Sequence, residues 1–354
     1  EVSLLPPGRE LTPTEARLWA EQGVDQPAPH LLSQAVARQN GGVTELRVVA
    51  VLVEFPDLAA DKDLHPRQYF EDLLFSHGVV PGGSVAEFLE TSSHGRLRFT
   101  GEVRGWYTVS EERNIYTSSQ GGLGSYPHNS QRLAEEAIWL AHPDTNYAHF
   151  DNAGPDGVPD WGDDDEIIDG LIVIHAGMGR VGGSTPDDFI SVAWWTPAFF
   201  PADGVRGLFF ILTPELGALG IFLHEIGHML GLPDLYDYDS DIGVDGGVGN
   251  FDMMDANMYD PNCFSKWMLG WLEPTVVSTT SQSLTLDDTA SSPECVLIWP
   301  DATVDDIFSE FFLVQNRQDV GNDEVGIHPD GLAVWHIDST LESTGRTFLY
   351  NNSY

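Results

Sequence analysis

Two nearly continuous apolar runs mark the centre of a predicted sheet. Residues 46–55 read LRVVAVLVEF and residues 170–176 read GLIVIHA. Runs of this length and β-branched content predict strands that are buried on both faces. Residues 97–107 partly alternate between apolar and polar positions, which predicts a third strand lying on the same sheet.

Three segments between these runs carry apolar residues at helical spacing. Residues 66–75, 84–91 and 129–142 are therefore predicted to form helices. Ser84 with Glu87 three positions later is a capping-box pattern, which places the start of the second helix. No internal repeat is evident, and we predict a fold of the α+β class.

A fourth helix is predicted in the apolar stretch that follows residue 213. Thr213, Pro214 and Glu215 are interpreted as an N-cap, a proline at the first helical position and an acid in the first turn. Gly231 suits a left-handed helix end, and Pro233 prevents the helix from resuming. The apolar positions at helical spacing are Leu216, Leu219, Phe222, Leu223, Ile226 and Leu230. This pattern predicts a mostly buried amphipathic helix.

The predicted fourth helix carries two histidines on one face. His224 and His228 are four positions apart, close enough for two imidazoles to hold one zinc ion. Glu225 lies one position round the helix, where a general base would take a proton from zinc-bound water. Asp234 is predicted as the third ligand, with Asp237 or a later acid as the alternative. Because such polar groups are costly on a buried helix without a metal, we predict a zinc site.

From about residue 274 the chain changes to short apolar runs separated by Asp, Asn, Gly and Pro. This spacing predicts a C-terminal antiparallel β module at 274–354, which packs on the preceding body or continues beyond this chain. The runs are 283–286, 295–299, 311–315 and 332–337. Residues 1–42 are predicted to be an N-terminal extension, which leaves 43–273 as the domain that carries the zinc site.

Composition argues against several classes of partner. The 354 residues include 16 Lys and Arg against 55 Asp and Glu, and the formal net charge of −39 argues against nucleic acid and anionic membranes. Hydrophobic residues make up 42% of the chain, enough for packed cores, and no apolar run reaches membrane-spanning length. Cys263 and Cys295 either form a disulfide or remain buried thiols. The chain begins at Glu1 without a signal-like segment, so we expect any export signal to have been removed.

A second group of acids surrounds a glycine turn. Residues 151–160 read DNAGPDGVPD, and further acids follow. Hard oxygen ligands spaced two residues apart around a turn are typical of calcium sites. The predicted calcium ligands are Asp151, Asp156, Val158 through its carbonyl, Asp160, Asp165 and Glu166. A solvated acidic loop is the alternative. The acids after the zinc helix have the same two interpretations: Asp237, Asp239, Asp241 and Asp245.

Several stretches, taken together, carry a family resemblance. They are LVEF at 52–55 with Asp57, GWY at 105–107, DGLIVIHAG at 169–177, Pro214-Glu215, residues 224–236, KWMLGW at 266–271, NRQ at 316–318 and GLAVWHID at 331–338. In this order they resemble the immune inhibitor A family of secreted bacterial metalloproteases. The likeness covers most of the chain and is far more specific than the zinc motif alone.

The resemblance implies a zincin-like metalloprotease domain, with a twisted mixed sheet and a zinc-binding helix. It implies His224, His228 and Asp234 as zinc ligands and Glu225 as the base. It also implies calcium for stability, secretion, and synthesis as a precursor (a zymogen).

The sequence offers several candidates for other residues of the expected site. Met254, or Met253 beside it, looks like the methionine turn beneath the zinc in related proteases. Tyr259 is a candidate for stabilising the oxyanion of the reaction, as are His175 and Tyr236. A structural role is the alternative for each, and no spacing separates the three.

We therefore expect a secreted, monomeric zinc endopeptidase that acts on protein or peptide substrates. One alternative is a catalytically silent or latent calcium-dependent extracellular binding protein, although the intact Glu225 argues against it. Another is a zinc hydrolase that acts on a non-peptide amide. Residues 1–42 are either a surface-docked extension or the remnant of an inhibitory pro-segment, in which Asp25 or His30 would occupy the water position on zinc.

Overall fold

The computed structural model describes the chain from residue 44 to residue 340, with gaps. The described ranges are 44–151, 166–180, 185–235, 248, 251–256, 259–277, 283–299, 307–324 and 330–340. The predicted N-terminal extension at 1–42 lies outside these ranges. So do the predicted calcium ligands Asp156, Val158, Asp160 and Asp165, the acids at 237–245, and Tyr236.

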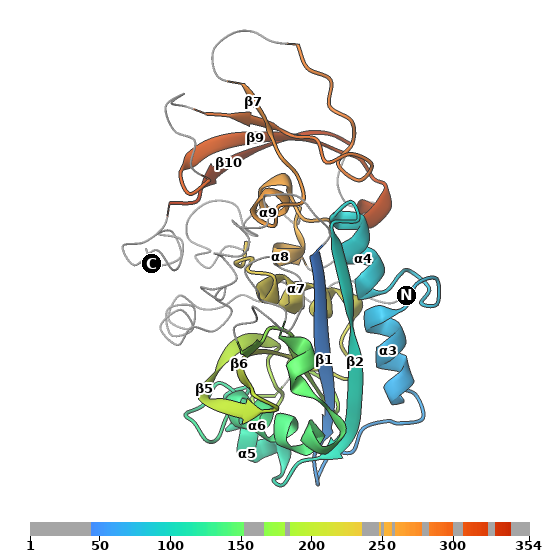
Figure 1. Ribbon diagram of the computed structural model, residues 1–354, viewed down its shortest axis with the longest axis vertical. Coiled ribbons are helices and arrows are strands. Elements are labelled where there is room, and N and C mark those ends of the chain that lie inside the picture. Colours follow the sequence, from blue (N-terminus) through green and yellow to red (C-terminus); the bar gives the residue numbers. More distant parts are fainter. Residues whose placement is uncertain are drawn as a thin grey trace.

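A mixed six-stranded sheet forms the body of the protein (Figure 1). Its parallel strands follow the order β2-β1-β4-β6-β3, and β5 pairs antiparallel with β6. The bounds are β1 Thr44–Glu54, β2 Leu97–Thr108, β3 Ile167–Ile168, β4 Leu171–His175, β5 Val192–Ala202 and β6 Val205–Pro214. The three strands predicted from the apolar runs are confirmed as β1, β2 and β4. The apolar pattern did not predict the hairpin of β5 and β6.

Helices cover both faces of this sheet. Along β1, the even-numbered residues Val48 to Leu52 pack in a first core with α3 (Arg67–Phe75), α4 (Val85–Ser92) and α7 (Leu219–Met229). The odd-numbered residues Val49 to Val53 pack in a second core with α6 (Ser130–Ala141). This alternation explains why the β1 sequence is apolar at nearly every position. The capping box is confirmed at the start of α4, where Ser84 and Glu87 bond reciprocally.

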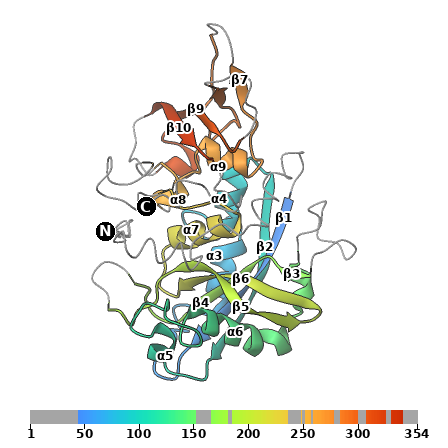
Figure 2. The ribbon, with the colours of Figure 1, turned by 90° about the vertical axis from the view of Figure 1, so that its left-hand side faces the viewer.

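Short elements complete the body. They are α5 (Arg113–Thr117), α8 (Met253–Ala256), α9 (Cys263–Met268) and the 3₁₀ turns at His142–Asp144, Tyr147–Phe150 and Gly321–Asp323. Figure 2 shows α7 between the main sheet and the C-terminal part of the chain, with α8 beside it. No helix among the described residues is long and apolar enough to cross a membrane.

A four-stranded sheet lies at the C-terminal end of the described chain. Its order is β10-β9-β8-β7, with bounds β7 Thr275–Val277, β8 Val296–Ile298, β9 Glu310–Arg317 and β10 Gly331–Asp338. The pairs β8–β9 and β9–β10 are antiparallel, but β7 and β8 run parallel. The prediction of an antiparallel sheet is therefore wrong for this pair. Two strands can pair in parallel only when a long connection joins them, and the connection between β7 and β8 is long enough for this. Residues 283–286 form no strand.

The C-terminal sheet and the body share the first core. Leu297 of β8, together with Phe311 and Leu313 of β9, is buried in the same cluster as the residues of α7 and α9. Both cysteines lie in this cluster as buried free thiols, and burial together with the neighbouring Cys295 thiol raises the pKa of Cys263. The packing makes the C-terminal sheet a direct neighbour of the elements around the predicted zinc helix.

Candidate metal centre

The predicted zinc helix begins later than its sequence signals indicated. Thr213 and Pro214 are the last residues of β6 and pair with the end of β4, and α7 begins at Leu219 without a side-chain cap. Glu215 is buried and accepts hydrogen bonds from the backbone N–H groups of Asp61 and Gly177, both at 2.8 Å. The predicted helix start is therefore wrong, because Glu215 joins two loops instead of acting in the first turn.

The end of α7 agrees with its prediction. Gly231 adopts a φ of 99°, a left-handed conformation that glycine tolerates without strain. The N–H of Leu232 donates to the carbonyl of Gly227 at 2.9 Å, which closes the last turn. This reversal turns the chain back alongside the helix and brings Asp234 to the histidine face.

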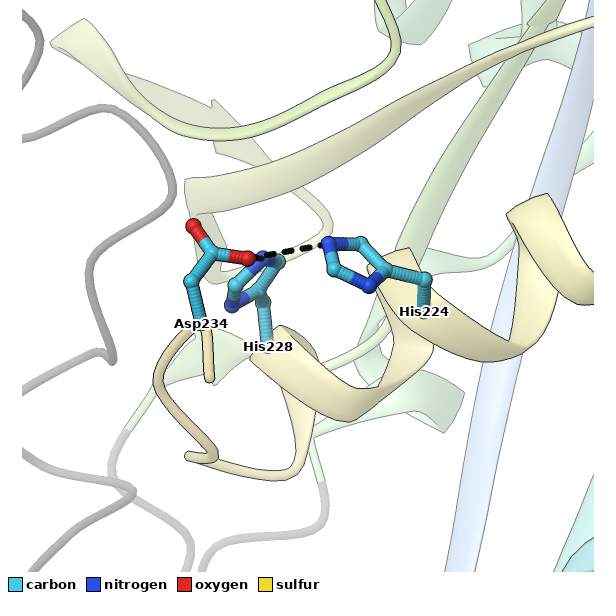
Figure 3. Close-up of side chains that lie close together, drawn as sticks. All are labelled: His224, His228 and Asp234. Carbon is cyan, nitrogen blue, oxygen red and sulfur yellow. Dashed lines mark ion pairs between the residues drawn. The ribbon is translucent and has the colours of Figure 1, made fainter. Parts of the chain in front are cut away.

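Three side chains converge on one point above α7 (Figure 3). Asp234 Oδ1 lies 3.0 Å from His224 Nε2 and 3.3 Å from His228 Nε2. The ligand atoms of the three residues all lie within 4.8 Å of one another, and all three residues are buried. Among the described residues, no other group of three His, Cys, Asp or Glu side chains meets this criterion.

Backbone carbonyls orient both imidazoles. His224 Nδ1 lies 3.1 Å from the carbonyl oxygen of Met253, and His228 Nδ1 lies 2.9 Å from that of Leu232. When such a ring is neutral, its Nδ1–H donates to the carbonyl and its Nε2 lone pair is the one that a metal would bind. The two rings stand at 89° to each other, with centroids 4.9 Å apart, and their Nε2 atoms both face Asp234.

The clustered groups shift one another's pKa values. Burial alone would raise the pKa of Asp234, but the charge of His228 and hydrogen bonds from both imidazoles hold it well below the usual range. Burial opposes protonation of His224, yet the hydrogen bond to Asp234 raises the pKa of that imidazole. Two imidazole nitrogens and one carboxylate oxygen, buried and convergent, fit a zinc ion that keeps a further position for water.

Comparison with known proteins gives the chain its family. The family model described as "Immune inhibitor A peptidase M6, catalytic domain" matches residues 34–264 of the 354 residues. The chain belongs to the immune inhibitor A peptidase family. This confirms the resemblance drawn from the sequence and makes the protein a member of a metallopeptidase family.

Two relatives show how far the similarity extends. The chain is 29% identical to immune inhibitor A of Bacillus thuringiensis subsp. alesti over 237 aligned residues, in a match that covers 56% of this chain and 34% of the relative. It is 25% identical to the pre-pro-metalloprotease PrtV of Vibrio cholerae serotype O1 over 300 residues, 72% of this chain and 32% of the relative. The chain thus spans about a third of the length of these relatives.

The two methionines predicted for the methionine turn lie against α7. A Cβ built on Gly227 would lie 2.2 Å from Met254 Sδ and 2.7 Å from Met253 Cε. Both side chains are therefore packed beneath α7, where only glycine leaves room for them. Met254 makes the closer approach, and the carbonyl of Met253 holds His224.

Other predicted site residues lie in different surroundings. Tyr259 is buried, and burial followed by the charge of Asp323 raises its pKa, while its role in stabilising the oxyanion stays a prediction. His175 packs against Phe55 and Phe189 of the second core, on the face of the sheet opposite α7. This packing supports the alternative that His175 is a structural residue.

The described part of the predicted calcium loop consists of its two ends. Asp151 is buried, and its Oδ2 accepts a hydrogen bond of 2.9 Å from the N–H of Glu166. The two described residues at the ends of the predicted loop therefore lie together. The role of this segment in calcium binding stays a prediction.

The buried His175 predicts a specific pH dependence of stability. Burial lowers its pKa from 6.5 to about 4, while the neighbouring Arg113 and Asp188 have opposing effects. Between these values the unfolded chain binds a proton that the folded chain does not, so the stabilisation is present above pH 6.5 and is lost as the pH falls. From pH 7 to 4.5, His175 is expected to cost about 2 kcal/mol of unfolding free energy.

Urea unfolding of the wild type and His175→Gln at several pH values checks this expectation. The variant should lose less stability on acidification, whereas His336→Gln, at an exposed histidine, should follow the wild type. Parallel curves for all three proteins would show that His175 is not a buried neutral imidazole.

Proposed function

We propose that the chain is a zinc-dependent endopeptidase that hydrolyses peptide bonds of proteins. The observation that carries this proposal is the cluster of His224, His228 and Asp234, with both imidazoles oriented by backbone carbonyls. Membership of the metallopeptidase family supports the same assignment. The chain spans about a third of the length of its relatives. Its action on protein substrates is therefore part of the proposal.

The three clustered residues would hold the metal through His224 Nε2, His228 Nε2 and a carboxylate oxygen of Asp234. Zinc bound there would lower the pKa of a water molecule and polarise the scissile carbonyl. The hydrogen bonds to Met253 and Leu232 fix the tautomers of the ligands and remain in place when the Nε2 atoms are occupied.

Glu225 would act as the general base. It is 4% exposed and follows His224 directly on α7, and this burial next to a predicted ligand supports the role. It would take the proton of the attacking water and deliver it to the leaving nitrogen of the peptide bond. A buried carboxylate suits this work, because it is poorly hydrated.

Zincin-like architecture, secretion, a precursor form and calcium binding are further parts of the proposal. The mixed sheet with α7 on one face supports the first. The acidic composition and the pairing of Asp151 with Glu166 are compatible with an extracellular, calcium-binding chain. Tyr259 and the methionine turn at Met254 keep their predicted roles in this proposal.

A chelator experiment tests the proposed function. The purified chain should cleave casein or a quenched fluorescent peptide, and 1,10-phenanthroline should abolish cleavage because it removes zinc. Its non-chelating isomer 1,7-phenanthroline should have no effect, and zinc added in stoichiometric amount should restore cleavage. Hydrolysis that persists after complete zinc removal would contradict the proposal. A zinc-loaded chain that cleaves no peptide would favour the silent binding protein.

A further inference from the structure

One buried guanidinium holds both ends of the segment that lies against the zinc helix. Arg317, the last residue of β9, is 2% exposed. Its Nη1 donates to the carbonyl of Phe251 at 2.5 Å, and its Nη2 donates to the carbonyl of Asp260 at 3.0 Å. Arg317 therefore fixes the two ends of the segment 251–260, which includes α8 and both methionines.

Asp323 completes this arrangement. Its carboxylate accepts two hydrogen bonds from Arg317, 2.9 Å from Nε and 2.5 Å from Nη2, and a third of 3.0 Å from the N–H of Asp260. Asp260 is also held by Ser92 Oγ at 2.6 Å and by Lys266. A planar guanidinium with this bidentate partner has little freedom to rotate.

The held segment contacts the metal site at two points. The carbonyl of Met253 accepts the hydrogen bond from His224 Nδ1 at 3.1 Å, and the carbonyl of Met254 accepts one from the N–H of Leu235 at 3.1 Å. Leu235 directly follows Asp234 in the chain. Two successive carbonyls thus fix the orientation of one predicted zinc ligand and the backbone beside another.

The turn between these carbonyls and Arg317 is itself rigid. Asp252 accepts hydrogen bonds from the N–H of Met254 at 2.8 Å, from the N–H of Asn262 at 2.7 Å and from Ser265 Oγ at 3.0 Å. Its side chain is fully buried. A displacement at Phe251 would therefore be passed to the carbonyls of Met253 and Met254 and would not be absorbed by a flexible turn.

We propose that Arg317 is a positioning residue for the metal centre, and that the C-terminal sheet sets zinc affinity through it. The proposal rests on the proposed function, since it concerns the same three ligands. Replacing a group that orients a metal ligand typically weakens metal binding by 10- to 100-fold. Lysine at position 317 keeps the charge but lacks the planar fork, so it cannot hold Phe251, Asp260 and Asp323 together.

The test measures zinc affinity by competition with a chromophoric chelator in the wild type and Arg317→Lys. The variant should bind zinc about 10- to 100-fold more weakly while it remains folded, as judged by circular dichroism and cooperative unfolding. The absorption spectrum of the cobalt-substituted variant should also differ from that of the wild type, because the ligand geometry changes. Arg96→Lys is the matched control, since Arg96 also donates to a backbone carbonyl, that of Gly270, at 3.0 Å.

The possible outcomes separate the two proposals. A folded Arg317→Lys chain with wild-type zinc affinity and an unchanged cobalt spectrum would overturn the role of Arg317. A comparable loss in Arg96→Lys would do the same, because it would show a general effect of destabilisation. If Arg317→Lys does not fold, Asp323→Asn, which removes the bidentate partner, decides in the same assay. A wild type that binds no zinc would instead contradict the proposed function.

Discussion

Replacing Glu225 with glutamine is expected to lower kcat/KM for peptide hydrolysis by about 10³-fold, within the range that general acid–base catalysis supplies. Glutamine has nearly the same shape but cannot accept a proton at neutral pH. Since Glu225 is not one of the three clustered ligands, the variant should keep its zinc. The measurement combines steady-state kinetics on a fluorogenic peptide with metal analysis of the same preparation.

Glu310→Gln provides the control for this variant. Glu310 lies on β9, and its side chain is 62% exposed, so the same change of charge there should leave the kinetics unaltered. If Glu225→Gln cleaved peptides at the wild-type rate with zinc bound, Glu225 would not be the base. A loss of zinc together with activity would assign it to the metal site instead.

Replacing His228 with glutamine is expected to remove both zinc and activity. Its side chain is fully buried, and its Nε2 faces Asp234 while its Nδ1 faces the carbonyl of Leu232. Among the described residues, no other His, Cys, Asp or Glu belongs to a cluster that could replace it. A metal that binds only the folded chain stabilises it by about 4 kcal/mol when its concentration is a thousand times Kd. The variant should lose this zinc-dependent stabilisation.

Thermal unfolding with and without added zinc measures the effect. The wild type should unfold at a higher temperature when zinc is present, and His228→Gln should unfold at the same temperature in both conditions. His77→Gln, at an exposed histidine just after the end of α3, should respond to zinc like the wild type. A zinc response in His228→Gln as large as in the wild type would exclude His228 as a ligand.

The parts of the fold that were predicted correctly have strong local signals. The run at 46–55 is apolar on both faces because β1 lies between two cores. Ser84 and Glu87 cap the helix that they begin. Gly231 ends α7 in a conformation that glycine tolerates. In each case the residues that decide the structure lie within a few positions of one another.

The errors arose where a local signal had a distant partner. Pro214 and Glu215 have the composition of a helix start, but Pro214 pairs with His175 of β4 and Glu215 bonds to Asp61 and Gly177. The β5–β6 hairpin was missed because its residues follow a glycine-rich stretch and precede this apparent helix start. Sheet pairing across the chain, which no local pattern reports, overrode the propensity.

The sequence predicted which three residues cluster, but it did not predict the groups that orient them. The spacing of His224, His228 and Asp234 is written in the sequence, and the structure brings these residues together. The groups that orient them are backbone carbonyls of Met253 and Leu232, which any residue type could supply. Arg317 lies far along the chain, and only its place within the NRQ stretch of the family resemblance singled it out.

An anomalous-difference map at the zinc absorption edge tests the central claim most directly. Crystals of the purified chain should show one strong peak about 2.0–2.2 Å from His224 Nε2, His228 Nε2 and a carboxylate oxygen of Asp234. The peak should vanish after treatment with 1,10-phenanthroline and return with added zinc. Zinc bound in stoichiometric amount elsewhere, with these three side chains in direct contact and no peak among them, would contradict the account.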